Sequence, residues 1–194
     1  MVYVVAIEGT IGAGKSSLVS QLSKEFSCFP EPVEEWSLLQ NFYDDMYAYS
    51  LPFQLQVLLS YHKMYSNLKD REDTVIIERC PWSSHYIFTK MLVNDGYIQE
   101  NDYKLYRNIY NKIAFKPDAT IYLKVDSHTA YKRILNRDRA SERSLELFYL
   151  KNLTTIYDDT MYHLNDVYVV DATKPLSEVK NKVSAILKDI QLQP

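Results

Sequence analysis

Cysteine, positive charge and long apolar runs are all in short supply in this sequence, and each shortage excludes a class of protein. Two cysteines in 194 residues, Cys28 and Cys80, are too few for a disulfide framework and lack the spacing of metal ligands. The formal net charge of −3 argues against a nucleic acid or an anionic membrane as a partner. No apolar run approaches the roughly 18 residues that span a bilayer, and the first residues contain no basic leader. We therefore expect a soluble protein of the cytoplasm.

Glycine and arginine are also scarce, but both are clustered. Three of the four glycines, Gly9, Gly12 and Gly14, lie within six residues of one another. Four of the seven arginines lie within eleven residues, at Arg133, Arg137, Arg139 and Arg143. This clustering indicates two sites, one with a special backbone requirement and one with a special charge requirement.

Apolar segments that resemble buried strands alternate with segments of helical periodicity. The strands are predicted at residues 2–7, 28–29, 74–77, 119–125 and 167–170. The helices are predicted at about residues 16–26, 36–43, 50–68, 81–93, 102–115, 127–137, 144–164 and 177–190, with Ser127 as an N-cap. This alternation is typical of a parallel sheet covered by helices on both faces. Because no repeat or linker interrupts it, we expect a single three-layer α/β domain over residues 1–194.

Residues 9–16 form a glycine-rich phosphate-binding pattern. They read G-T-I-G-A-G-K-S, which satisfies G-x-x-x-x-G-K-[ST], and they lie between a predicted strand and a predicted helix. In such a loop the backbone N–H groups surround a phosphate, the lysine reaches the outer phosphates and the serine hydroxyl binds Mg²⁺. The alternative is a purely structural glycine turn. We expect a nucleoside triphosphate to bind here, held by Gly9, Thr10, Ile11, Gly12, Ala13, Gly14, Lys15, Ser16 and Ser17.

Two carboxylate positions follow predicted strands and could act on a phosphoryl acceptor. Glu31 lies between two prolines after the second strand, where a carboxylate could accept a hydroxyl proton or belong to a solvated acidic turn. Glu78 and Arg79 end another strand, where they could hold a metal and an anion or form a surface ion pair. A switch GTPase is not indicated, because the mid-chain Asn-Lys pair is followed by Ile113-Ala114 without the required aspartate.

Five motifs in order resemble those of the deoxyribonucleoside kinase family, which includes cellular deoxycytidine, deoxyguanosine and mitochondrial-type thymidine kinases and related viral enzymes. The motifs are residues 9–16, Glu31-Pro32-Val33 with Trp36, Phe53-Gln54, Glu78-Arg79, and Arg133-x3-Arg137-x-Arg139-x2-Glu142. The resemblance extends from residue 4 to about residue 175. It implies a P-loop kinase fold with a five-stranded parallel sheet and an arginine-bearing lid at about residues 137–143.

The resemblance also implies ATP-dependent phosphorylation of a deoxynucleoside 5′-hydroxyl with Mg²⁺. Glu31 resembles the general base, Arg79 the residue that holds the 5′-oxygen, and Glu78 the residue that organises Mg²⁺ together with Ser16. Lys15 and the lid residues Arg137 and Arg139 complete the catalytic set that we expect, and Arg133 and Arg137 are expected to contact ATP.

The nucleoside pocket is implied by the same family likeness. Gln54 resembles the glutamine that pairs with the base edge. Tyr43 and Glu142 resemble the pair that binds the sugar 3′-hydroxyl. The aromatic walls around the base are expected from Trp36, Phe53 and Phe88.

Three positions depart from the family pattern. Cys80 stands where the family commonly has serine, Ser84 where kinases that prefer deoxycytidine or purines have aspartate, and Tyr61 where the partner arginine is found. Without that charged pair, the pocket has room for a 5-methyl group. We therefore expect thymidine as the main substrate, with deoxyuridine and deoxycytidine as secondary ones.

The sequence is compatible with other functions and with a dimeric assembly. A thymidylate kinase would need a further cation for the acceptor's phosphate, and none is evident beside Glu31. A non-catalytic P-loop regulator would leave Glu31, Glu78 and the arginine cluster without a role. The resemblance implies a homodimer built from helix faces in residues 83–93 and 97–115, which could equally be core. It also suits a cytosolic or virus-encoded enzyme, the latter acting in the host cytoplasm.

Overall fold

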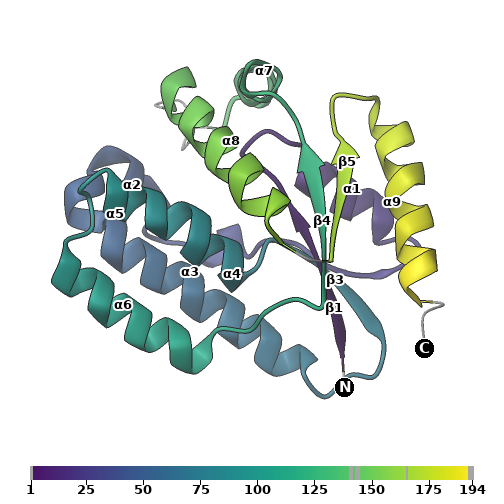
Figure 1. Ribbon diagram of the computed structural model, residues 1–194, viewed down its shortest axis with the longest axis horizontal. Helices are drawn as coiled ribbons and strands as arrows, with labels where there is room; N and C mark the ends of the chain where they lie inside the picture. Colours follow the sequence, from purple (N-terminus) through teal and green to yellow (C-terminus); the bar gives the residue numbers. More distant parts are fainter. Residues whose placement is uncertain (1, 140–141, 143–144, 165, 192–194) are drawn as a thin grey trace.

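Five parallel strands form the sheet at the centre of the computed structural model, which describes residues 2–139, 142, 145–164 and 166–191. The strand order is β2-β3-β1-β4-β5 (Figure 1). In the register, Val5 of the central strand lies beside Ile76 on one side and Ala119 on the other. The strands are β1 (Tyr3–Glu8), β2 (Ser27–Phe29), β3 (Thr74–Glu78), β4 (Ala119–Lys124) and β5 (Val167–Asp171). The predicted five-stranded parallel sheet is confirmed.

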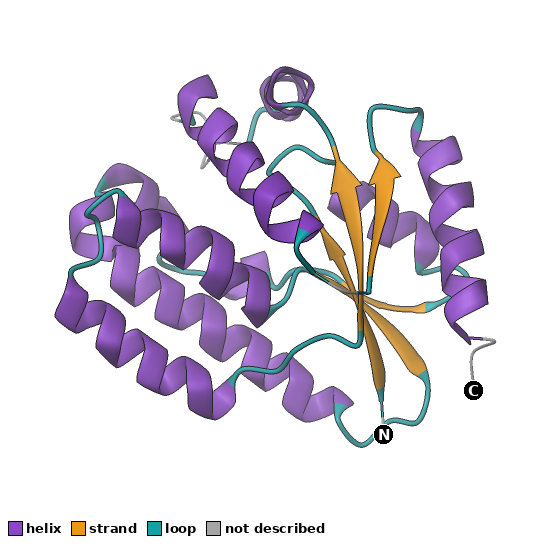
Figure 2. Cartoon of the chain, viewed as in Figure 1, coloured by secondary structure: helices purple, strands orange, loops and turns teal. Residues whose placement is uncertain are grey.

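Helices follow or precede each strand and pack on both faces of the sheet (Figure 2). The longer helices are α1 (Lys15–Leu22), α3 (Met46–Leu68), α6 (Glu100–Ile113), α7 (Ser127–Arg137), α8 (Leu147–Tyr162) and α9 (Leu176–Gln191). The shorter elements are the 3₁₀ turn η1 (Val33–Glu35), α2 (Leu39–Asp44), α4 (Pro81–Ser83), the π-helical segment η2 (Ser84–Thr89) and α5 (Lys90–Asn94).

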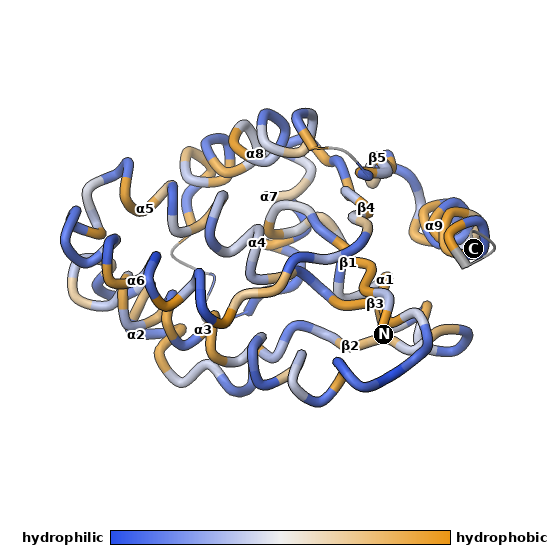
Figure 3. The backbone as a smooth tube through the Cα atoms, turned by 60° about the horizontal axis from the view of Figure 1, so that its bottom comes forward, coloured by the Kyte–Doolittle hydropathy of each residue, from blue (hydrophilic) through white to orange (hydrophobic). Residues whose placement is uncertain are grey.

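The core consists of layers on either side of the strands, because alternate strand residues face opposite helices. On one face, Ile7 of β1 packs with Leu18 of α1 and Val183 of α9. On the other face, Ala6 belongs to a cluster with Leu68 of α3, and α8 packs there against β4 and η2. Figure 3 shows the hydrophobic residues of β1 and β3 in the middle of the molecule, and those of α9 beside them. This arrangement confirms the predicted α/β architecture.

Several helix boundaries differ from the predictions. Residues 36–43 were predicted as one helix, but η1 and α2 flank an irregular stretch there. The helix predicted from residue 50 begins at Met46, because Asp45 caps it by accepting a hydrogen bond from the Ala48 N–H at 3.1 Å. The prediction of Ser127 as an N-cap is wrong by one residue, since Asp126 accepts from the Thr129 N–H at 2.9 Å. The predicted helix start at residue 144, like Arg143, lies outside the described residues.

The segment predicted as one helix over residues 81–93 has a wider turn in its middle. Three pieces, α4, η2 and α5, follow one another there. In the π-helical piece, the backbone winds five residues per hydrogen-bonded turn instead of four. Its last residue, Thr89, has its hydroxyl oxygen 2.8 Å from the carbonyl oxygen of Ser84, five positions earlier. Such bulges are frequent at functional sites.

Because the strands are parallel, the carboxyl ends of neighbouring strands lie at the same edge of the sheet. The glycine-rich loop follows β1, Glu31 follows β2, and Arg79 follows β3, so all three emerge at the carboxyl edge of adjacent strands. Ligands of open α/β sheets bind at this edge. Among the described residues, no helix combines the length and the apolarity that crossing a membrane requires.

Candidate active site

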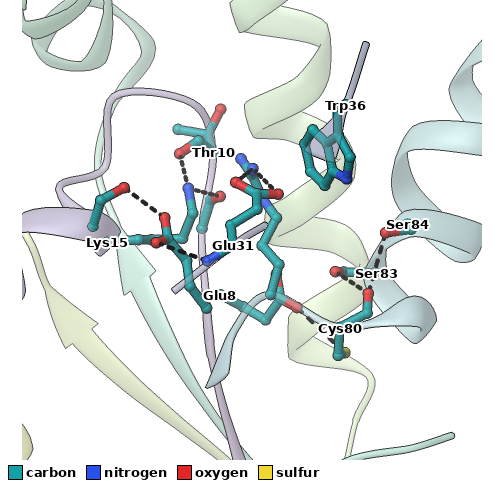
Figure 4. Close-up of polar contacts among 12 residues, drawn as sticks. Glu8, Thr10, Lys15, Glu31, Trp36, Cys80, Ser83 and Ser84 are labelled. Atoms are coloured by element: carbon teal, nitrogen blue, oxygen red, sulfur yellow. Dashed lines mark hydrogen bonds and ion pairs between the residues drawn. The ribbon is translucent and has the colours of Figure 1, made fainter. Parts of the chain in front are cut away.

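The glycine-rich loop between β1 and α1 holds its lysine in a buried position. The Lys15 ammonium group donates hydrogen bonds to the carbonyl oxygens of Gly9 and Thr10, both at 3.0 Å (Figure 4). Burial, followed by the nearby charge of Arg79, lowers the pKa of Lys15 to about 7. The group is therefore poised to gain a proton when an anion enters the loop.

Gly12 meets two local requirements that only glycine satisfies. Its φ is +81°, in the left-handed region that other residues rarely adopt. A Cβ atom there would also lie 2.4 Å from the Ala130 carbonyl oxygen of α7. The loop and α7 therefore approach each other backbone to backbone.

Ser16 and Glu78 form the oxygen pair that was expected to hold Mg²⁺. The Ser16 hydroxyl donates to Glu78 Oε1 at 2.7 Å, and the backbone N–H of Glu31 lies 3.5 Å from Glu78 Oε2. A hydroxyl and a carboxylate are ligands that Mg²⁺ accepts, and this metal commonly takes only one or two protein ligands together with phosphates and water. Within the described residues no group of three or more His, Cys, Asp or Glu side chains could hold a metal ion. The pair fits a nucleotide-borne Mg²⁺.

Glu31 and Arg79 form a close ion pair at the centre of the site. Arg79 Nη1 donates to both carboxylate oxygens of Glu31, at 2.8 and 2.7 Å, and both side chains are only 10% exposed. Figure 4 shows Glu31 between Lys15 on one side and Trp36 on the other. The backbone of Arg79 has a φ of +59°, a strained value that clusters at functional sites. The guanidinium carbon also lies 4.9 Å from the centre of the Phe88 ring.

A cavity of about 480 Å³ opens beside this ion pair. The structure brings most of the predicted residues together in its lining: Ile11, Gly12, Lys15, Ser16, Glu31, Trp36, Tyr43, Phe53, Gln54, Glu78, Arg79, Phe88, Arg137, Arg139 and Glu142. The sequence reasoning assigned no role to Val33, Glu34, Leu39, Gln40, Phe42, Val57, Leu92 and Tyr149, which line it as well. These are mostly apolar side chains of helices, which resemble ordinary core residues in the sequence.

The base-binding end of the cavity that the resemblance implied is aromatic. Trp36 and Phe53 meet edge to face with their centroids 5.7 Å apart, and Phe42, which was not predicted, stacks on Phe53 at 4.8 Å. The indole N–H of Trp36 donates to the Ser60 hydroxyl at 2.9 Å, which fixes the ring. The side chain of Gln54 lies in the same wall and is 3% exposed.

The predicted sugar-binding and lid residues line the same cavity. Glu142 is 11% exposed and accepts a hydrogen bond from Arg137, and its other oxygen lies 3.8 Å from Arg139. Burial, followed by the charge of Glu142, raises the pKa of Tyr43. Glu142 is therefore paired with lid arginines while it faces the same cavity as Tyr43. Part of the predicted lid, residues 140, 141 and 143, lies outside the described residues.

Six predicted phosphate-binding residues do not line this cavity. Gly9 and Thr10 instead support Lys15 from behind through their carbonyl oxygens. A second hollow of about 370 Å³ next to the loop is lined by the other four, Ala13, Gly14, Ser17 and Arg133, together with Gly12, Arg137 and Lys174. There, the guanidinium of Arg133 donates to the carbonyl oxygens of Ala13 at 3.3 Å and Ala172 at 2.7 Å.

Two of the three positions that depart from the family pattern make unexpected contacts. Tyr61 is fully buried; its hydroxyl donates to the Glu78 carbonyl oxygen at 2.9 Å and lies 3.3 Å from Glu31 Oε1, so it supports the ion pair. The thiol of Cys80 donates to Glu8, with Sγ 3.4 Å from Oε1. The sequence analysis did not identify Glu8 as part of the site.

Glu8 is the last residue of β1 and is fully buried. Its second carboxylate oxygen accepts a hydrogen bond from the Tyr157 hydroxyl at 3.2 Å, and burial raises its pKa. A glutamate at the end of an otherwise apolar strand was the signal that could have revealed it, since an acidic side chain is rarely fully buried without partners.

One cavity is surrounded by carboxylates at the strand edge, by a buried lysine in a glycine-rich loop and by the arginines of the predicted lid. This combination is typical of a nucleotide-dependent phosphotransferase. A sequence model described as Deoxynucleoside kinase matches residues 5–192. The chain therefore belongs to the deoxynucleoside kinase family, and its sheet and helices form the P-loop kinase fold of that family.

Individual relatives cover almost the whole chain. A protein of Invertebrate iridescent virus 3 that is named as a kinase is 52% identical over 96% of this chain and 97% of its own length. A protein of Fowlpox virus named as a probable deoxycytidine kinase is 31% identical over 96% of this chain and 86% of its own length. Among solved structures, a deoxyadenosine kinase from M. mycoides with dCMP and dCDP bound has a TM-score of 0.86 and 28% identity, covering 96% of this chain and 99% of the other. The phosphorylation of deoxynucleosides is the activity that this family supports.

Proposed function

We propose that this chain transfers the terminal phosphoryl group of MgATP to the 5′-hydroxyl of thymidine, with deoxyuridine and deoxycytidine as secondary acceptors. The fowlpox and M. mycoides relatives are named for deoxycytidine and deoxyadenosine, so the proposed preference for thymidine depends on the cavity itself. The observation that carries it is the surroundings of Gln54. In the part of the chain that is described, no charged side chain hydrogen-bonds to Gln54 or to the neighbouring Ser84.

The absence of a charged hydrogen-bond partner favours thymine for two reasons. A glutamine amide carries a donor and an acceptor, so it can pair with the N3–H and O4 of thymine without help. An aspartate near this position would instead accept a hydrogen bond from an exocyclic amine, and it would place a negative charge beside the apolar 5-methyl group of thymine. Ser84 lines the cavity, and its small uncharged hydroxyl would leave space for the methyl group.

In the proposed reaction, Glu31 accepts the proton of the 5′-hydroxyl as that oxygen attacks the phosphorus atom. The guanidinium of Arg79 lies within hydrogen-bond distance of Glu31, the proposed general base. Arg79 can therefore hold the sugar oxygen or the transferred phosphoryl group. Lys15, Arg137 and Arg139 stabilise the negative charge that spreads over the phosphoryl oxygens. Most of the rate enhancement would come from positioning and charge stabilisation.

The donor nucleotide would enter from the side of the glycine-rich loop. Ser16 and Glu78 would hold Mg²⁺, which neutralises phosphate charge when it is bound. The second hollow, with Ser17 and Arg133 in its lining, adjoins the loop and is a suitable place for the remainder of ATP.

A phosphoryl-transfer assay with ATP and a panel of acceptors tests the proposed function. The panel contains the natural deoxynucleosides, deoxyuridine, the ribonucleosides and thymidine monophosphate. We expect the highest kcat/KM with thymidine and little transfer to thymidine monophosphate. A preference for deoxycytidine or a purine deoxynucleoside would refute the proposed specificity but not the kinase activity.

The same assay separates the alternatives. Preferred transfer to thymidine monophosphate would indicate a thymidylate kinase, for which the cation nearest Glu31 is Arg79, already held by both carboxylate oxygens. An absence of acceptor-dependent ADP release would indicate a nucleotide-binding regulator.

The predicted homodimer is also retained as a proposal. Tyr86 of η2 and Leu105 of α6 are 47% and 50% exposed and belong to the segments that the resemblance indicated. A second copy of the chain would cover them.

A further inference from the structure

Thr89 lies behind the wall of the cavity, in contact with Gln54. It is the last residue of η2 and is fully buried, and it does not line the cavity. Its hydroxyl oxygen lies 3.2 Å from Gln54 Oε1 and 2.8 Å from the carbonyl oxygen of Ser84. In the described part of the chain, this hydroxyl is the hydrogen-bond partner of the Gln54 side chain.

The hydroxyl has only one hydrogen, and it lies within hydrogen-bond distance of both the Gln54 amide oxygen and the Ser84 carbonyl oxygen, with the Tyr106 hydroxyl as a further neighbour. When Thr89 donates to Gln54 Oε1, the amide oxygen is held on the side of Thr89. When Thr89 donates to the Ser84 carbonyl instead, its oxygen is free to accept, and the amide is stabilised with its NH₂ group toward Thr89. The two arrangements exchange the positions of the amide oxygen and nitrogen.

The two amide orientations suit different bases. Thymine presents a donor at N3 and an acceptor at position 4, whereas cytosine presents an acceptor at N3 and an amine donor at position 4. A glutamine that pairs with both atoms must therefore turn its amide over to change from one base to the other. The hydrogen bond that the amide makes on the protein side therefore sets the free-energy cost of this rotation.

We propose that Thr89 is a specificity-determining positioning residue, whose hydroxyl orients the Gln54 amide and so sets the preference between keto-type and amino-type bases. This inference rests on the proposed function, in which Gln54 pairs with the base. The π-helical turn is part of the device, because it places the Ser84 carbonyl five residues before Thr89 and supplies the competing acceptor.

Removal of this hydroxyl tests the inference. In Thr89→Val, the side chain keeps its shape but loses its donor and acceptor, so neither amide orientation is favoured from behind. We expect the ratio of kcat/KM for thymidine to that for deoxycytidine to move toward one by about three- to tenfold, the range of one neutral hydrogen bond. Thr89→Ser retains the hydroxyl and should keep the ratio of the unmodified enzyme.

Controls separate orientation from general damage. Thr120→Val removes another buried threonine hydroxyl, on β4 and outside the cavity lining, and should leave the ratio unchanged. If Thr89→Val does not fold, as judged by its melting transition, Thr89→Ala is measured in its place. A ratio within twofold of the unmodified enzyme in the variant that folds would overturn the inference, as would an equal loss for both substrates or the same shift in Thr89→Ser.

A further variant separates this inference from the proposed function. Gln54→Leu should raise KM for thymidine and deoxycytidine alike by removing the base contact. If Gln54→Leu has this effect while Thr89→Val leaves the ratio unchanged, Gln54 binds the base and Thr89 does not orient it. If Gln54→Leu leaves both KM values unchanged, the proposed base contact itself is wrong.

Discussion

Replacement of Glu31 by glutamine tests the proposed chemistry most directly. The amide has the size of the carboxylate and keeps one acceptor oxygen for Arg79, but it cannot take a proton. General-base catalysis contributes about 10²- to 10⁴-fold, which corresponds to about 3–5 kcal/mol of activation free energy. We therefore expect kcat to fall at least about a hundredfold, while the Kd for thymidine changes less than about fivefold.

The same substitution should affect the folded state more mildly. Arg79 donates to both Glu31 oxygens, at 2.8 and 2.7 Å, and loses one of these two charge-assisted hydrogen bonds. A hydrogen bond to a charged group contributes about 1.5–3 kcal/mol. A lower melting temperature is expected, with folding intact, because one oxygen still accepts from the guanidinium while the amide NH₂, which can only donate, faces Arg79 in place of the other oxygen.

The assay is acceptor-dependent ADP release, with thymidine binding measured separately by calorimetry. Glu35→Gln is the matched control, because Glu35 is a nearby carboxylate that is 48% exposed and paired with Lys63 at the surface. It should retain normal turnover. A Glu31→Gln enzyme with kcat within fivefold of the unmodified protein would refute the assignment of Glu31 as the base.

Three further predictions concern the donor site, the sugar and the assembly. Burial lowers the pKa of Lys15 to about 7, from an unfolded value near 10.5, so the unfolded chain binds the proton more tightly. The contribution of Lys15 to the free energy of unfolding should therefore rise with pH between about 7 and 10.5. ATP binding at pH 8 should accordingly take up a proton, which calorimetry in buffers of different ionisation enthalpy detects, and Lys15→Met should abolish that uptake. Tyr43→Phe and Glu142→Gln should each reduce the preference for deoxyribose over ribose several-fold; an unchanged ratio of thymidine to ribothymidine turnover would contradict the sugar assignment. Leu105→Glu should convert a dimer to a monomer in sedimentation experiments, and a monomeric unmodified protein would dismiss the dimer proposal at once.

The strand pattern and the loop motif could be predicted from the sequence because both depend on local residue types. Continuous apolar runs such as residues 2–7 are typical of strands that are covered on both faces, so they locate the parallel sheet. The glycines of residues 9–16 are needed by the backbone itself, as the +81° φ of Gly12 shows.

The supporting residues of the site could not be predicted because they act through tertiary contacts. Glu8, Tyr61 and Thr89 lie 23, 30 and 58 positions away from the carboxylate at position 31, so no local motif joins them to it. The π-helical turn is equally hidden, because residues 84–89 have no composition that distinguishes five-residue from four-residue winding.

The pairing of Glu142 with Arg137 and Arg139 joins the residue proposed to bind the sugar to the cations proposed to bind phosphate. A carboxylate that satisfies Arg137 and Arg139 cannot offer the same lone pairs to a sugar hydroxyl without some rearrangement of those cations. On the proposed roles, a sugar hydroxyl and these arginines would compete for Glu142, so sugar binding would change the freedom of the arginines to reach a phosphate. By thermodynamic reciprocity, a donor that recruits the arginines changes the affinity for the acceptor by the same factor. If Glu142 binds the sugar as proposed, this single acidic side chain would couple the binding of the two substrates.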